Sequence, residues 1–130
     1  ANAESMFNTP PVFPVYTVLL NLRWIAKNGG LKGIGAQNDK KAALMYKEID
    51  RNPLFEGFAH NEDRSNMNAT FNLLDERQAQ VFDPLWNSAN ISGLKGHRSV
   101  GGYRASIYNA LPIESIQVLV DCMQEFERKA

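Results

Sequence analysis

The stretch Asn66-Met67-Asn68-Ala69-Thr70-Phe71-Asn72-Leu73 decides the fold class. Apolar residues occupy every second position of this stretch, and asparagine or threonine occupies the positions between them. A period of two predicts a strand that buries one of its faces. Two more strands are expected, over residues 55–58 and 103–108. In the second of these, Arg104 falls on the face opposite Tyr103 and Ala105.

Two helices are predicted before these strands. Pro10 and Pro11 indicate the start of the first, and Gly29-Gly30 its end. The second, over residues 31–49, carries an apolar stripe with helical spacing. The charged residues that fall off this stripe are Lys40, Lys41, Lys47 and Glu48.

Two further helices are predicted among and after the strands. Asp75 with Gln78 three residues later resembles a capping box that opens a third helix. Pro84 lies inside this helix, so we expect a kink or a restart with Asp83 as the N-cap. A last helix starts at Pro112 and presents one apolar stripe. The order helix, helix, strand, strand, helix, strand, helix indicates an α+β fold with a small sheet covered by helices.

The first helix is unusual because its apolar residues cover nearly the whole circumference between positions 12 and 25. A helix of this kind needs burial on all sides. We therefore interpret it as part of an interface with something outside this chain.

Length and composition restrict the class of function. The 130 residues suffice for one domain, and 14 basic residues balance 14 acidic ones. A neutral chain is not expected to bind nucleic acid or an anionic membrane non-specifically. The single cysteine, Cys122, excludes an internal disulfide and is expected to be a buried, inert thiol. With no confident transmembrane segment and no signal peptide, we expect a cytoplasmic protein.

The densest polar cluster suits an anion. Its cationic residues are Lys95, His97, Arg98 and Arg104, and its glycines are Gly93, Gly96, Gly101 and Gly102. Arginine matches phosphate and carboxylate with two bonds, and glycine lets a backbone N–H approach an oxyanion. The alternative is a basic hairpin tip in solvent. Likewise, Arg104 is either a solubility charge on an edge strand or a ligand fork held by a rigid element.

Other kinds of site have weaker support. No second metal ligand stands at the right spacing from His60 or His97, so we predict no metal site, and His60 is expected in solvent. Ser99 and Ser106 lack the sequence context of a serine nucleophile.

A longer string of residues carries a family resemblance. The run LKGHRSVGGYRASIYNALP occupies residues 94–112, and NTPP, KAAL and DRS stand at 8–11, 41–44 and 63–65. From about Met6 onward, the chain resembles the phosphoserine aminotransferases. These are fold-type I transaminases that depend on pyridoxal phosphate and work as homodimers. They interconvert 3-phosphohydroxypyruvate plus glutamate with phosphoserine plus 2-oxoglutarate in serine biosynthesis, and in bacteria often serve pyridoxine synthesis too.

The resemblance implies a division of the chain and a role for several residues. Residues 1–7 would be a tag or the tail of a preceding domain, 8–30 an interdomain helix, and 31–130 the C-terminal small domain with a mainly antiparallel sheet. The implied contacts are those of His97 and Arg98 with the substrate phosphate, of Arg104 with the substrate α-carboxylate, and of Asn8 and Thr9 with the cofactor phosphate in the neighbouring subunit.

The chain also departs from the family pattern. The Schiff-base lysine, the aromatic residue that stacks on the cofactor and the aspartate that pairs with its nitrogen all lie upstream of the NTPP segment in this family. We therefore expect no catalytic residue in this chain, no bound pyridoxal phosphate and no turnover by the chain alone. Residues 82–92 match poorly, and Asn66 stands where many members have arginine. The alternative function is a free-standing, non-catalytic domain that binds a phosphorylated ligand or packs against a partner protein.

Overall fold

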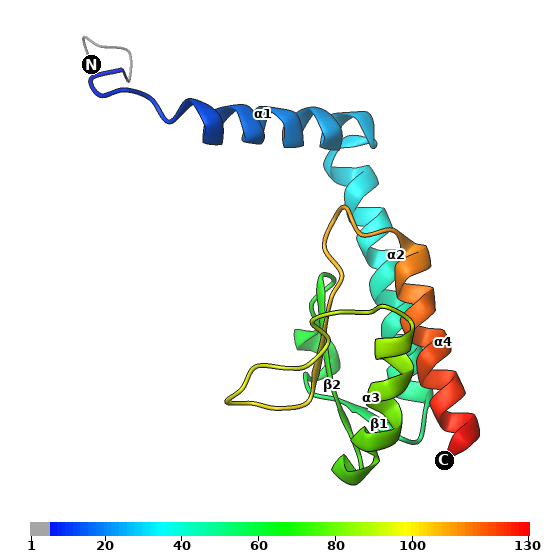
Figure 1. Cartoon of the computed structure of the whole chain (residues 1–130). Coiled ribbons are helices and arrows are strands. Elements are labelled where there is room, and N and C mark those ends of the chain that lie inside the picture. The colour runs from blue at the N-terminus through cyan, green and yellow to red at the C-terminus, as the bar shows by residue number, and fades with distance from the viewer. Residues whose placement is uncertain (1–5) are drawn as a thin grey trace. The chain divides into compact units, whose positions relative to one another are not determined.

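The computed structural model describes residues 6–130, and the chain divides into two compact units, Ala1–Gly35 and Ala36–Ala130. Most of the tag or tail expected over residues 1–7 lies outside the described residues. The helices are α1 (Val12–Lys27), α2 (Gly30–Arg51), α3 (Ala79–Ser88) and α4 (Ile113–Lys129). The strands are β1 (Phe55–Gly57), β2 (Asn68–Leu73) and β3 (Tyr103–Ser106), and short 3-10 turns span Asn61–Asp63 and Glu76–Gln78. The predicted order of elements is confirmed (Figure 1).

The three strands form one antiparallel sheet in the order β1-β2-β3. Phe55 pairs with Leu73, and Thr70 pairs with Arg104. The alternation predicted for β2 is confirmed, because Ala69, Phe71 and Leu73 are buried while the residues between them are partly exposed. Met67 is an exception, since the strand begins one residue later and leaves this side chain exposed.

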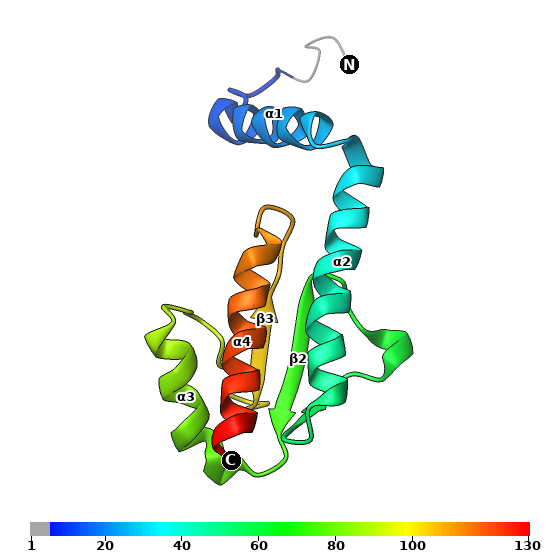
Figure 2. The ribbon, with the colours of Figure 1, turned by 90° about the vertical axis from the view of Figure 1, so that its right-hand side faces the viewer.

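Helices cover one face of the sheet, as Figure 2 shows for α2 and α4 in front of β2 and β3. The core between them is rich in aromatic rings: Phe55, Phe71, Phe82, Tyr103 and Phe126. Their centroids lie 5.1 to 5.8 Å apart. Most of these pairs meet edge to face, an arrangement worth about 0.5–1.5 kcal/mol per pair beyond burial of area. The other face of the sheet is thereby left to polar side chains.

Two charged residues that fall off the apolar stripe of α2 are nonetheless buried. Lys41 is 2% exposed, and its ammonium donates to the carbonyl oxygens of Tyr108 at 2.6 Å and of Ile107 at 3.1 Å. Glu48 is 3% exposed and accepts hydrogen bonds from Arg51, Asn52 and Gln124. Burial of these groups is possible because their hydrogen bonds are made inside the protein.

The predicted start of the third helix is only partly right. Asp75 does accept a bond from a backbone N–H, that of Arg77, but it caps the 3-10 turn rather than α3. The helix then runs without interruption through Pro84, so of the two expected alternatives, a kink or a restart with Asp83 as N-cap, the restart is wrong. Asp83 uses its carboxylate for tertiary contacts instead.

Helix α1 buries none of its residues within its unit. Its exposed apolar side chains include Val12, Phe13, Val15, Tyr16, Val18, Leu19, Leu20, Leu22 and Trp24. Gly29, whose φ is +89°, follows the helix and supplies the backbone conformation that favours glycine. Among the described residues, no helix is long and apolar enough to cross a membrane.

Candidate anion-binding site

Arg104 projects from the sheet face that the helices leave uncovered. Its neighbours in β3, Tyr103 and Ala105, point into the core, so the pleat of the strand directs Arg104 to the opposite side. Its backbone is held on both sides, by the pairing with Thr70 and by donation from its N–H to the Leu94 carbonyl at 2.7 Å. The guanidinium is therefore attached to a rigid strand. It lies on the face opposite Tyr103 and Ala105, as predicted from the alternation.

Residues 95–103 form a closed loop, called here the anion loop. Lys95 and Tyr103 pair as an antiparallel bridge at its base. The Gly96 N–H donates to the Gly102 carbonyl at 2.8 Å, and a Cβ at Gly96 would lie only 1.9 Å from the Gly101 oxygen. Gly101 and Gly102 have φ values of +79° and +63°. Glycine is thus required by the turn itself, in addition to any role toward an anion.

His97 and Arg104 line one cavity of about 200 Å³. Its other side chains include Phe58, Thr70 and Asn72. This volume lies below the range of about 300–1,000 Å³ that is typical of sites for drug-sized ligands, so it suits a small anion. Arg98 is exposed on the same loop but does not line this cavity. The structure therefore brings together two of the three predicted substrate contacts.

The ring of His97 is oriented by its own loop. Its Nδ1 lies 2.7 Å from the Ser99 hydroxyl and accepts from the Ser99 backbone N–H at 3.3 Å. The His97 carbonyl also accepts from the N–H groups of Val100 and Gly101, at 2.9 and 2.8 Å. Because Nδ1 accepts a bond, a neutral ring carries its proton on Nε2, which can donate to an anion.

Lys95 is not a free member of the cationic cluster. Its ammonium lies 2.5 Å from Asp83 Oδ2, while Asp83 Oδ1 accepts from the Tyr103 hydroxyl at 2.8 Å and the Trp86 indole at 3.1 Å. Burial acts to raise the pKa of Asp83, but the hydrogen bonds and the charge of Lys95 outweigh it and hold that pKa below the ordinary value. No sequence pattern predicts this contact, since Asp83 and Lys95 meet only through the packing of α3 against the loop.

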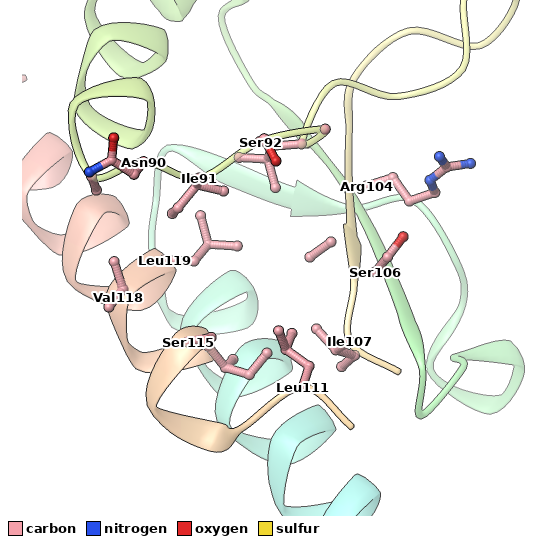
Figure 3. A pocket seen from close by; sticks show the side chains of 15 residues that line it. Asn90, Ile91, Ser92, Arg104, Ser106, Ile107, Leu111, Ser115, Val118 and Leu119 are labelled. Carbon is pink, nitrogen blue, oxygen red and sulfur yellow. The ribbon is translucent and has the colours of Figure 1, made fainter. Parts of the chain in front are cut away.

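A larger cavity of about 340 Å³ lies on the core side of β3. Ile91, Leu111 and Leu119 line it, together with serines 92, 106 and 115. Figure 3 shows the guanidinium of Arg104 directed away from this cavity, although the residue forms part of its wall. An apolar crevice without a charged group directed into it does not suit a doubly anionic substrate.

The remaining predicted residues are not members of the anion loop. Asn8 and Thr9 are exposed, precede α1 and belong to the other compact unit. His60 is exposed, and Cys122 is buried, where desolvation raises the pKa of its thiol as expected for an inert cysteine. Among residues 6–130, no group of three or more His, Cys, Asp or Glu side chains could hold a metal ion.

Comparison with known proteins gives the family. The sequence model of "Aminotransferase class-V" matches residues 1–119. Phosphoserine aminotransferases of Flavobacterium psychrophilum and Flavobacterium johnsoniae are each 61% identical to the chain over 127 residues, which cover 98% of the chain and 36% of either relative. The chain thus spans about a third of the length of the curated relatives it matches.

Solved structures agree with these sequence matches. The phosphoserine aminotransferase from Bacillus circulans subsp. alkalophilus superposes with a TM-score of 0.90 at 45% identity, over 98% of this chain and 36% of that one. A PLP-bound phosphoserine aminotransferase from Trichomonas vaginalis gives a TM-score of 0.83 at 38% identity, over 95% of this chain and 36% of that one. The α+β fold with its small antiparallel sheet is the fold of this part of those enzymes. The chain belongs to the class-V aminotransferase family, among the phosphoserine aminotransferases.

Proposed function

We propose that the chain is the C-terminal domain of a phosphoserine aminotransferase and supplies the anchors for the two anionic ends of the substrate. The parent enzyme would convert 3-phosphohydroxypyruvate and glutamate into O-phosphoserine and 2-oxoglutarate. The observation that carries this proposal is that His97 and Arg104 line one small cavity on the sheet face left free by the helices. A basic hairpin tip in solvent would not need to share a cavity with a strand arginine.

Separate cations suit a substrate that is anionic at both ends. His97 and Arg98, on the anion loop, would bind the phosphate, and Arg104, on β3, would bind the α-carboxylate. Hydrogen bonds to charged groups contribute about 1.5–3 kcal/mol each. Two such anchors fix the orientation of the carbon atoms between them, which is what a positioned reaction requires.

Neither Lys41 nor Lys95 is available to hold pyridoxal phosphate. That cofactor needs a free lysine amine and a partner for its ring nitrogen. The Lys41 ammonium is occupied by backbone carbonyls, and the Lys95 ammonium by Asp83. We therefore propose that the cofactor is held by the remainder of the parent protein, and that the chain alone has no turnover.

The exposed helix α1 supports the proposed division of the chain. Residues 8–30 would pack against the large, cofactor-binding domain of the parent, and residues 31–130 would be the small domain. Asn8 and Thr9 would then reach the cofactor phosphate in the neighbouring subunit of a cytoplasmic homodimer. A helix with apolar residues on all sides fits a position between several partners.

Substitution of Arg104 tests the anchor role. In the parent enzyme, Arg104→Ala is expected to raise the KM for phosphoserine about tenfold or more, because a charge-assisted bond worth about 1.5–3 kcal/mol is lost. The melting temperature should stay within about 2 °C of wild type, since the side chain is exposed. Arg77→Ala is a matched control, because Arg77 is also exposed but pairs with Asp75 away from the cavity.

The isolated chain gives a second test. It should bind O-phosphoserine with a Kd in the millimolar range or weaker, because the contacts of the cofactor and the large domain are missing. The titration can be followed through the NMR signals of His97 and the glycines of the anion loop. Transamination of phosphoserine by this chain, supplied with pyridoxal phosphate, would contradict its assignment as a domain without catalytic residues.

A further inference from the structure

Both ends of the anion loop converge on one carboxylate. Lys95 and Tyr103 are the two residues of the bridge that closes the loop. The ammonium of Lys95 lies 2.5 Å from Asp83 Oδ2, and the hydroxyl of Tyr103 donates to Asp83 Oδ1 at 2.8 Å. Asp83 belongs to α3, so an element outside the loop holds both of its ends.

The carboxylate of Asp83 is itself held in place. The indole of Trp86, one turn further along α3, donates to Asp83 Oδ1 at 3.1 Å, and Trp86 is buried in the core. The ammonium of Lys95 also lies 4.7 Å from the centroid of the Tyr103 ring, which adds a cation–π contact. The Asp83 carboxylate is thus held by three contacts, with Lys95, Tyr103 and Trp86.

The anion-binding side chains have few contacts of their own. In the described part of the chain, the His97 side chain hydrogen-bonds to Ser99 alone, and the Arg98 side chain has no hydrogen-bond partner. Both residues are exposed. Their location therefore depends on the backbone of the loop, and that backbone depends on how its ends are fixed.

We infer that Asp83 is a positioning residue for the anion site, which holds the base of the anion loop so that His97 and Arg98 face the phosphate before it binds. The inference rests on the proposed function for the identity of the ligand, but the ordering of the loop by Asp83 can be measured without any ligand. Order that is already present in the free protein reduces the entropy lost on binding.

Simple electrostatics predicts the opposite effect, which makes the inference easy to test. Asp83 is a negative charge near a site for an anion, and its removal would release the positive charge of Lys95. If Asp83 had no positioning role, Asp83→Asn would therefore bind phosphoserine with equal or greater affinity. If Asp83 positions the loop, the same substitution weakens binding in spite of the more favourable charge.

The experiment measures loop order and affinity in the 130-residue chain. In Asp83→Asn without ligand, backbone order parameters of residues 96–102 should fall from about 0.85 to below about 0.6, while those of β2 stay unchanged. The Kd for O-phosphoserine should rise about fivefold or more. A loop that stays ordered, or a Kd that stays equal or falls, would overturn the inference.

Control variants separate positioning from loss of fold. Asp83→Glu keeps the carboxylate and should recover part of the loop order and affinity. Asp75→Asn removes a carboxylate that pairs with Arg77 outside the loop and should change neither. Lys95→Gln alone should lower loop order less than Asp83→Asn, because Tyr103 still donates to Asp83. Adding Lys95→Gln to Asp83→Asn should lower it little further, because the contact between the two residues is already lost. If the wild type bound no phosphoserine, the proposed function would fail, while the order parameters would still decide the role of Asp83.

Discussion

Lys41 is a buried cation whose partners are backbone oxygens. Besides Ile107 and Tyr108, its ammonium reaches the carbonyl of Leu111 at 3.2 Å, so one side chain of α2 fixes the whole connection between β3 and α4. Desolvation lowers the pKa of this ammonium, which shows that its burial is costly. The contact is maintained because several carbonyls share the ammonium, so its hydrogen bonds are made inside the protein.

Removal of the Lys41 ammonium should therefore destabilise the protein strongly. Lys41→Met keeps most of the side-chain volume but removes the donor from the carbonyls of Ile107 and Leu111, at about 1–3 kcal/mol for each unsatisfied group. We expect the free energy of unfolding to fall by about 2–4 kcal/mol, measured by urea denaturation. Lys40→Met, at the exposed neighbouring position, should change it by less than about 0.5 kcal/mol. Equal effects of the two variants would contradict this account.

At the scale of single residues, local pattern predicted some orientations and not others. The direction of Arg104 followed from alternation along β3, because a strand's pleat alone decides which side chains share a face. The burial of Lys41 and Glu48 did not follow from the helical stripe. Lys41 donates to the Ile107 carbonyl, 66 residues away, and Glu48 accepts from Gln124, 76 residues away, in addition to its nearby partners Arg51 and Asn52. A pattern within one helix holds no information about the distant partners.

The contact between α3 and the anion loop should depend on pH. Hydrogen bonds from Lys95, Tyr103 and Trp86 outweigh desolvation and hold the pKa of Asp83 below its ordinary value of 3.8. A carboxyl group with a lowered pKa in the folded state stabilises the fold above the unfolded-state pKa. This contribution is lost as the pH falls from about 4 through the lower pKa of the folded state.

The expected result concerns the slope of stability against pH. Between about pH 5 and pH 2, the free energy of unfolding should fall less steeply for Asp83→Asn than for wild type, because the variant has no proton to take up at this position. Urea denaturation at a series of pH values gives both curves. Parallel curves would show that Asp83 has the same proton affinity in the folded and unfolded states.

At the scale of elements, tertiary packing explains why α3 does not restart at Asp83. Pro84 removes one backbone hydrogen bond, and this local cost suggested either a kink or a restart there. Phe82 and Trp86, on either side of the proline, are both buried in the core. A break between them would expose one of two large aromatic side chains, and burial of each is worth more than one hydrogen bond. The strands and the other helices were predicted in type and order because their periodicities agreed with their packing.

For the whole molecule, the neutral net charge and average composition conceal an uneven distribution of exposed apolar surface. The candidate anion-binding residues His97, Arg98 and Arg104 lie in the second unit, whereas many of the exposed apolar side chains lie on α1. Soluble proteins rarely expose large continuous apolar patches unless these patches contact another molecule. The parent protein would supply that contact. In the isolated chain, the apolar side chains of α1 need another apolar surface to contact.

The isolated chain is therefore expected to associate through α1. Val15, Leu19 and Leu22 are exposed and spaced to share one side of the helix. Sedimentation should show dimers or larger species, and a dye that binds apolar surface should fluoresce. Changing all three residues to Gln, which keeps helix propensity high, should make the chain monomeric and reduce dye binding. Changing Leu74, Val81 and Val118 to Gln is the matched control, because these are exposed apolar residues of the other unit. A wild-type chain that sediments as a monomer and binds no dye would contradict the interpretation of α1 as an interface helix, since a helix exposed on all sides would then need no partner.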